Sequence, residues 1–513
     1  MKTLCVYLAL FMGTTRNLSA QEILFSKPFR TQNYSTSEVL GKIGKNYIVL
    51  ERGLVPYGKN ILRVFDQQMQ LVGDKKQVRL PPNGRNLQFL VYDSFLVKTY
   101  VENAGTHFLL IAVIMNGFAQ ELGSPIILDS MRSDVATFPF PAKWDVVHSL
   151  DKSKLLVNRV KYDQDSASIS TKIFDDRLQK LQFSDFKIFL PGGREFIGEF
   201  KISNGGDIYF PIQPVKAGMN KFEILSKPFK EKYYRSVLID LKSKYLNTNA
   251  LTFTIEETKG NGTLLINATY YSNVNSTVDE GFFSARINAE TNSSKAIFNP
   301  LMDSLFNRSK LSESSNRPAL ITLNNVFVLN NGGLMLVGEI DRPRFTMVGI
   351  TCDYLNQTII NPRYIYNPGY ADQYYQQQPM YMDPLAYGPK SRVELYNKDI
   401  VVCYLDSALK LQRQTVIEKD QNDIKTEMPL YLSFGVVNTS SGIHLLYREI
   451  QRSGGILRNT RFSASGEMVR LPPLKTIYDT YKIIPAYSKQ VGLRQVIIPG
   501  VYRGKTVIAK IDL

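Results

Sequence analysis

Histidine, cysteine and tryptophan are nearly absent from this sequence of 513 residues, which contains three His, three Cys and one Trp. Zinc clusters, haem sites and disulfide scaffolds need more of these side chains at characteristic spacings. A Gly-x-Ser-x-Gly elbow, a His-Glu-x-x-His helix and a phosphate-binding loop are also missing. We therefore expect no cofactor, no metal site, no catalytic residues and no enzymatic activity.

The three histidines lie in strand-like stretches, and we interpret them as structural. They are His107, His148 and His444. Beyond Cys5, the remaining cysteines are Cys352 and Cys403. Whether these two cysteines form a disulfide depends on a strand register that the sequence does not reveal. A disulfide and two buried thiols are therefore both open, and we favour buried thiols.

Long hydrophobic runs are absent too. The longest, Phe108 to Met115, has the length of a buried strand and is too short to span a bilayer. At the N-terminus, Lys2 precedes the apolar run Leu4 to Met12, and Ser19-Ala20 follows. This layout predicts a signal peptide over residues 1–20. We therefore expect an exported protein, with the periplasm favoured and the cell exterior or cell surface as the alternative.

Hydrophobic residues make up 44% of the chain, aromatic residues 11% and charged residues 21%. This composition indicates a globular protein with a large buried core. The 62 Lys+Arg exceed the 46 Asp+Glu and give a formal net charge of +16. The excess favours an acidic partner, and export argues against nucleic acid.

Strand-like alternation recurs from residue 37 to the C-terminus, as in Leu251, Phe253 and Ile255, without a convincing long amphipathic helix. Two series of turns interleave along the chain. The hairpin tips of the first series lie at 44–46, 103–105, 151–153, 204–206, 261–262, 331–333 and 441–442. The second series places a turn residue after a strand, at Asp66, Asn116, Asp175, Ser226, Asn288, Asp406 and Ser465.

Two hairpins per unit of about 50 residues predict a single all-β domain over residues 21–513 that is a β-propeller. The expected units are 37–82, 86–130, 143–190, 195–241, 250–300, 319–419 and 429–473, with a three-strand remainder at 480–513. Residues 22–29 would supply the missing strand of that last unit. We favour eight blades closed by this pairing, with seven blades next and stacked β-sandwiches as the rival architecture.

Two segments are candidate partner-binding sites. A basic stretch contains Lys227, Lys230, Lys232 and Arg235, interleaved with aromatic residues. It is either a solvated face or a patch for an anionic protein or glycan surface. The second segment is a Tyr/Pro/Gln-rich insertion at 354–392, which is either a tolerated loop or a binding arm, because tyrosine is enriched at interfaces. Its candidate contact residues are Tyr364, Tyr366, Tyr370, Tyr374, Tyr375, Tyr381 and Tyr387.

The stretch Tyr396-Asn397-Lys398-Asp399-Ile400-Val401-Val402, then Leu405-Asp406 and Ile417-Glu418-Lys419-Asp420-Gln421, resembles a group of exported proteins. These are secreted or periplasmic β-propeller proteins of the Bacteroidetes cell envelope, mostly without an assigned activity. The resemblance covers this one unit and, loosely, the repeat pattern. It implies an envelope protein more than a particular reaction.

From these observations we expect a non-enzymatic propeller that acts as a docking or scaffold subunit of an outer-membrane-associated protein complex. It would contact its partner through the insertion and the basic stretch, without a transmembrane segment of its own. The alternative is a glycan-binding or glycan-active propeller with a site at the central channel.

Overall fold

The computed structural model describes residues 23–32, 35–53, 59–81, 84–132, 143–162, 165–190, 195–214, 221–241, 245–246, 252–258, 261–274, 277–288, 291, 293–301, 320–347, 391–419, 421–425, 433–451, 454–474 and 481–513. The chain divides into two compact units, Met1–Gln77 with Ser433–Leu513, and Val78–Leu432.

The described residues form eight antiparallel sheets of four or five strands and contain no α-helix. The fold class is an eight-bladed β-propeller, as the repeats predict. We number the sheets as blades 1 to 8 in chain order, and their limits follow the expected units within a few residues.

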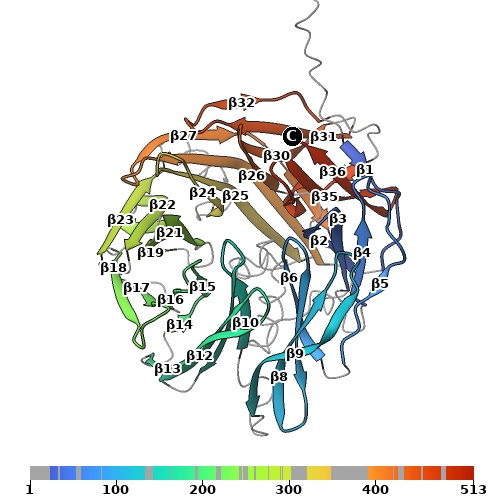
Figure 1. Ribbon diagram of the computed structural model, residues 1–513. Helices are drawn as coiled ribbons and strands as arrows, with labels where there is room; N and C mark the ends of the chain where they lie inside the picture. Colours follow the sequence, from blue (N-terminus) through green and yellow to red (C-terminus); the bar gives the residue numbers. More distant parts are fainter. Residues whose placement is uncertain are drawn as a thin grey trace, which may run out of the picture. The chain divides into compact units, whose positions relative to one another are not determined.

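The first unit contains blades 1, 7 and 8 (Figure 1). Blade 1 comprises β2 (Ser35–Ile43), β3 (Asn46–Gly53), β4 (Ile61–Phe65) and β5 (Lys76–Gln77). Blade 7 comprises β29 (Phe434–Thr439), β30 (Gly442–Gln451), β31 (Gly454–Phe462) and β32 (Met468–Arg470). Blade 8 comprises β33 (Tyr481–Ile483), β34 (Lys489–Gln490), β35 (Gln495–Tyr502), β36 (Lys505–Asp512) and β1 (Ile23–Phe25), with the short 3-10 turn η4 (Pro485–Tyr487).

The second unit contains blades 2 to 6. Blade 2 comprises β6 (Gly84–Val91), β7 (Leu96–Asn103), β8 (His107–Met115) and β9 (Glu121–Arg132). Blade 3 comprises β10 (Lys143–His148), β11 (Lys154–Tyr162), β12 (Ser166–Asp175) and β13 (Lys180–Phe189). Blade 4 comprises β14 (Glu195–Ile197), β15 (Lys201–Ile202), β16 (Ile208–Pro214), β17 (Lys221–Lys227) and β18 (Arg235–Asp240). Blade 5 comprises β19 (Tyr245–Leu246), β20 (Thr252–Thr258), β21 (Asn261–Val274), β22 (Thr277–Asn288) and β23 (Ser293–Pro300). Blade 6 comprises β24 (Leu320–Val328), β25 (Leu334–Met347), β26 (Ser391–Leu405), β27 (Leu411–Ile417) and β28 (Gln421–Lys425).

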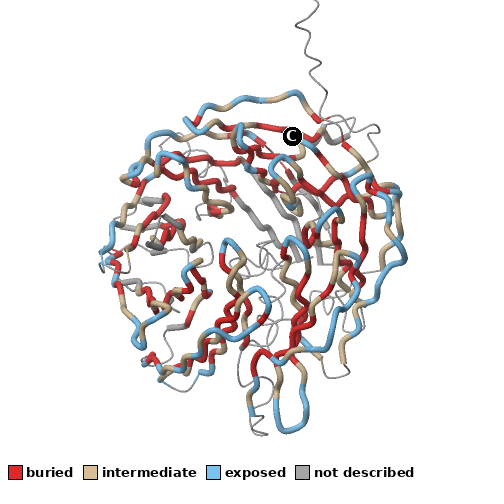
Figure 2. Tube along the Cα trace, in the orientation of Figure 1, coloured by how far each residue is buried: buried red, intermediate tan, exposed pale blue. Residues whose placement is uncertain are grey.

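In blades 3 and 8, the central strands are apolar on both faces because each of these two sheets packs between two neighbours within its own unit. On β35, Val496 and Ile498 join a core cluster with blade 7, whereas Ile497 between them joins a cluster with blade 1. On β11, Leu155 and Leu156 divide in the same way between clusters shared with blades 2 and 4. Figure 2 shows buried positions following the inner strands, and exposed positions both at the turns and along outer strands such as β9 and β13. Period-two alternation therefore assigns side chains to two different interfaces.

Blade 8 takes its outer strand from the N-terminal end of the described chain. β1 pairs antiparallel with β36, with Ile23 opposite Ile511 and Phe25 opposite Ala509. An isolated bridge between Phe29 and Thr506 continues the contact. The predicted pairing of residues 22–29 with the C-terminal strands is confirmed for the residues that the structure describes, and it covers an edge that would otherwise be free.

The second turn series has a common geometry. In the turn that starts at Asp66, the carboxylate accepts hydrogen bonds from the backbone of Gln68 and Gln70, and Met69 adopts φ +59° while remaining buried. Asn116, Asp175 and Asp406 start equivalent turns, with Ala119, Leu178 and Leu409 in the left-handed conformation. These turns accept left-handed non-glycine residues because the side chains of those residues fill the core.

Three positions of the predicted turn series differ from expectation. Ser226 lies inside β17, where it pairs with Arg235, so the turn of blade 4 begins only after Lys227. The tip at 103–105 joins the second and third strands of blade 2, whereas its first turn lies at Asp93 and Ser94. In blade 7 the turn begins at Ser463, whose hydroxyl accepts from Glu467, and not at Ser465. In blades 2 and 7, several neighbouring residues favour a turn. Local composition therefore does not show at which of them the turn forms.

Candidate docking surface

Blade 4 carries an exposed basic and aromatic turn between β17 and β18. We call residues 227–235 the Lys/Tyr turn. Its base rests on blade 4 and blade 3. The backbone N–H of Phe229 donates to Asp207 Oδ1 at 2.8 Å, and the side-chain amide of Gln182 on β13 donates to the Phe229 carbonyl. Gly206, at φ +99°, lets the ring approach, because a Cβ there would lie 2.7 Å from Phe229 Cδ2.

Two of the predicted basic residues hold the turn together. Lys227 is buried, and its ammonium donates to the Glu231 carbonyl at 3.0 Å. Burial lowers the pKa of the Lys227 ammonium, against the opposing effects of Asp207 and Glu231. Arg235 forms an ion pair of 2.5 Å with the Glu231 carboxylate. Lys227 therefore supports the turn from inside and is not part of the exposed patch that the sequence suggests.

The outer side of the turn presents Lys230, Lys232 and two tyrosines to solvent. Tyr233 is 79% exposed and Tyr234 is 39% exposed. The Tyr234 ring packs on Phe186 of β13 at a centroid distance of 5.4 Å. Within the described residues, no ion pair engages Lys230 or Lys232. The turn thus offers two cations and an aromatic ring on a backbone that internal contacts already order.

The Tyr/Pro/Gln-rich insertion starts from an extension of blade 6. Beyond the blade, β25 and β26 continue to pair from Asp341 with Asn397 to Met347 with Ser391, and β28 adds a third strand beside β26. At its root, the buried Lys419 ammonium contacts the carboxylate of Glu339 and donates to Gln421 Oε1 at 2.9 Å. The candidate residues Tyr364, Tyr366, Tyr370, Tyr374, Tyr375, Tyr381 and Tyr387 lie outside the described residues.

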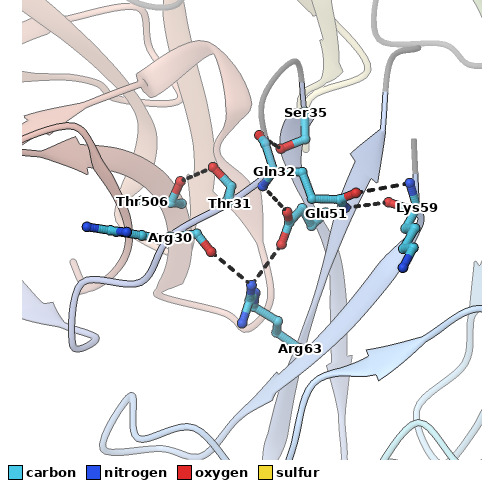
Figure 3. Close-up of polar contacts among 8 residues, drawn as sticks. All are labelled: Arg30, Thr31, Gln32, Ser35, Glu51, Lys59, Arg63 and Thr506. Carbon is cyan, nitrogen blue, oxygen red and sulfur yellow. Dashed lines mark hydrogen bonds and ion pairs between the residues drawn. The ribbon is translucent and has the colours of Figure 1, made fainter. Parts of the chain in front are cut away.

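A second polar cluster, which sequence reasoning missed, fastens the chain after β1 to blade 1 (Figure 3). Arg63 Nη2 donates to Glu51 Oε2 at 2.8 Å and to the Arg30 carbonyl at 3.3 Å. The Gln32 backbone N–H donates to Glu51 Oε1 at 2.6 Å. The Arg63 guanidinium also lies 4.2 Å from the centre of the Phe29 ring. The Glu51 carboxylate accepts hydrogen bonds within the cluster, whereas Arg63 Nε is buried without a hydrogen-bond partner among the described residues, and we interpret the cluster as a structural latch.

The sequence signal for this latch is weak. Glu51 faces Ile61 and Val49 faces Arg63 across β3 and β4, so the two charged residues lie diagonally on one face of the sheet. Because the two charged residues are twelve positions apart, their ion pair can be predicted only when the register of the hairpin is known.

The histidines occupy three separate structural settings. His107 contacts Thr106, His148 contacts the Ser149 carbonyl, and the buried His444 contacts Asn459 Oδ1 at 3.0 Å. Burial lowers the pKa of His444. In the described ranges no cluster of three His, Cys, Asp or Glu side chains could hold a metal ion.

The buried thiol of Cys403 is free, and burial strongly raises its pKa. Cys352 lies outside the described residues. No helix in the described part of the chain combines the length and the apolar character needed to cross a membrane.

No protein-family model matches the chain, and no curated protein matches it. Among solved structures, the WD40 domain of SCAP from fission yeast is 11% identical with a TM-score of 0.37, over 97% of this chain and 96% of that chain. An oligogalacturonate lyase in complex with manganese is 8% identical with a TM-score of 0.39, over 97% of this chain and 98% of that chain. The oligogalacturonate lyase from Vibrio parahaemolyticus is 8% identical with a TM-score of 0.36, over 96% and 98%. Similarities this distant carry no argument about what this chain binds or does.

Proposed function

We propose that this protein is a non-catalytic docking subunit of a cell-envelope complex associated with the outer membrane, and that the Lys/Tyr turn binds an acidic surface of a protein partner. The observation that carries this proposal is the exposure of Tyr233 and of two lysines on a turn ordered by the Glu231–Arg235 pair. The predicted signal peptide supports a place outside the cytoplasm.

Tyrosine contributes a large amphipathic contact area at low conformational cost, and an ordered turn loses little freedom on binding. Lys230 and Lys232 add attraction toward carboxylates, which steers association and weakens with salt. The insertion at 354–392 is a second contact region in this proposal, because it is rich in tyrosine and the paired strands β25 and β26 flank it in the sequence.

Affinity purification from envelope extracts, followed by mass spectrometry, tests the proposal. We expect Lys230→Glu with Lys232→Glu to remove a specific set of partners, and Tyr233→Ala to weaken their recovery at least about tenfold. A matched control reverses two exposed lysines elsewhere, Lys489→Glu with Lys505→Glu, and should retain the partners. Equal recovery with both double variants would refute the role of the turn.

The role of the insertion is tested separately. A variant that lacks residues 354–392 should lose part of the recovered set if the insertion contacts a partner. Binding to acidic glycans in the absence of any protein partner would instead favour the alternative of a glycan-binding propeller.

A further inference from the structure

The outer strand of blade 3 has an unusual exposed face. β13 is last in the sheet order β10-β11-β12-β13, and among the described residues no strand pairs with its free edge (Figure 1). Its side chains alternate between exposed and partly or fully buried from Leu181 to Phe189. On the exposed face Phe183 is 50% exposed and Phe189 is 72% exposed, with Asp185 and Lys187 between them.

The outer strands of blades 1, 2 and 7 carry features that discourage pairing with another chain. β5 has two residues and β32 has three, and each is followed closely by proline. β9 contains Gly123 and Pro125, and its pairing with β8 is interrupted by register shifts. By contrast, β13 pairs with β12 without interruption from Gln182 to Phe189, and this stretch contains no proline. Natural proteins seldom leave such an apolar edge uncovered.

The order of residues on β13 is self-complementary. The segment reads Phe183-Ser184-Asp185-Phe186-Lys187-Ile188-Phe189, with Phe186 at its centre. In an antiparallel pair of two such strands centred on Phe186, each Asp185 faces a Lys187 and each Phe183 faces a Phe189. Directly opposite residues project from the same face of a sheet, so these four pairs all form on the exposed face.

We propose that two copies of this chain associate through the free edges of β13, in an antiparallel arrangement with a two-fold axis at Phe186. The charges select this register. A shift of the axis by one residue would place Asp185 opposite Asp185 or Lys187 opposite Lys187, and like charges directly opposite one another are unfavourable. A two-fold axis uses the same patch on both partners, which is what a self-complementary strand provides.

The second copy is the occupant that the chemistry favours. An unrelated strand would need its own aromatic and opposite-charge pattern, whereas each copy of β13 already carries both halves of every pair. This association does not rest on the proposed docking function, because the Lys/Tyr turn and the exposed face of β13 contain different residues.

Sedimentation velocity of the full chain tests the proposal with two single variants. Asp185→Lys places lysines opposite lysines in a pair of identical copies, and Lys187→Asp places aspartates opposite aspartates. We expect each variant alone to be a monomer, with the dissociation constant of the dimer raised at least about tenfold. Mixing the two variants should restore a dimer, because each position then faces its opposite charge.

The control Arg470→Glu reverses an exposed charge on the outer strand β32 and should leave the dimer intact. Thermal midpoints of the variants establish that they are folded. A monomeric wild-type chain at all concentrations would overturn the proposal, as would a dimer that persists in both single variants or one that mixing fails to restore.

Discussion

Arg63 and Glu51 form an ion pair of 2.8 Å in which the side chains are 7% and 1% exposed. The same carboxylate accepts from the Gln32 backbone, and the same guanidinium reaches the Arg30 carbonyl. The pair therefore holds the segment that follows β1 against blade 1. Since β1 completes blade 8, one charged pair connects the two blades through the chain between them.

Removal of one partner of this latch should be costly, because the other charge stays buried without compensation. We expect Glu51→Ala to lower the free energy of unfolding by about 3–5 kcal/mol. Chemical denaturation measures the change. The matched control is Glu38→Ala, whose carboxylate pairs with Arg52 at 3.3 Å and is 33% exposed, and it should cost less than about 1 kcal/mol. Equal losses in the two variants would contradict the latch.

Asp129 joins blades 2 and 3 by accepting from Trp144 Nε1 at 2.6 Å and pairing with Lys172 Nζ at 2.7 Å. We expect Asp129→Asn to lower the free energy of unfolding by about 2–3 kcal/mol, because the carboxylate charge that faces Trp144, Lys172 and Arg159 is lost. Trp144 is the sole tryptophan, so its fluorescence reports this site. Asp93→Asn, at a carboxylate 98% exposed, should leave both stability and emission unchanged. An unaltered Trp144 spectrum in Asp129→Asn would count against this arrangement.

His444 should make the stability of the protein depend on pH. Burial lowers its pKa in the folded state, and Arg461 and Arg494 act in the same direction. The unfolded chain therefore binds a proton more readily, so the contribution is complete above pH ~6.5 and is lost as the pH falls below that value. Urea unfolding between pH 7.5 and 5 should show a slope of up to about 1.4 kcal/mol per pH unit that His444→Gln removes. An unchanged slope in the variant would disprove this role.

The contact of Gly206 with the Phe229 ring, which supports the Lys/Tyr turn, can be altered without changing the exposed residues of the turn. Gly206→Ala would strain a left-handed position and collide with the Phe229 ring, and we expect a loss of about 1–2 kcal/mol together with reduced partner recovery. Gly205→Ala is the matched control, since the nearest atom to the added Cβ would be Ser203 Oγ, at 3.4 Å. Full partner recovery with Gly206→Ala would show that the contact between Gly206 and Phe229 does not position the binding residues.

The thiol of Cys403 should resist alkylation while the protein is folded, because burial blocks the reagent and disfavours the thiolate. Mass spectrometry of iodoacetamide-treated protein should find this position modified only after denaturation. Rapid modification in the native protein would contradict the buried position of Cys403 on β26.

Much of the fold follows from local patterns. Asp66 and Asp406 each predict a turn because an acceptor side chain can bind the backbone two and four residues later, and strands such as β35 are apolar on both faces. Such turns recur in blades 1, 2, 3 and 6, with a related serine turn in blade 7, and their spacing allows the blades to be counted. The prediction for the turn at 103–105 is wrong, because Asp93-Ser94 satisfies the same local requirement and forms the first turn of blade 2.

The sequence predicts the candidate docking surface only in part. Lys227, Lys230, Lys232 and Arg235 look equivalent in the sequence, yet one is buried and another is paired with Glu231. Which lysines face solvent depends on how the turn folds back on blade 3, through Gln182 and Phe186. These contacts join residues about 50 positions apart in the sequence. No local sequence pattern shows that two such distant segments lie side by side.

The sequence by itself determined the strands, most of their turns, the repeat and the need for residues 22–29 to complete the last blade, since each of these depends on interactions between near neighbours or on a regular period. Only the tertiary structure decided which charges are buried, as with Glu51 and Arg63, and which face of β13 is left exposed. Burial is a property of the packed sheets, because it depends on surfaces brought together from distant parts of the chain.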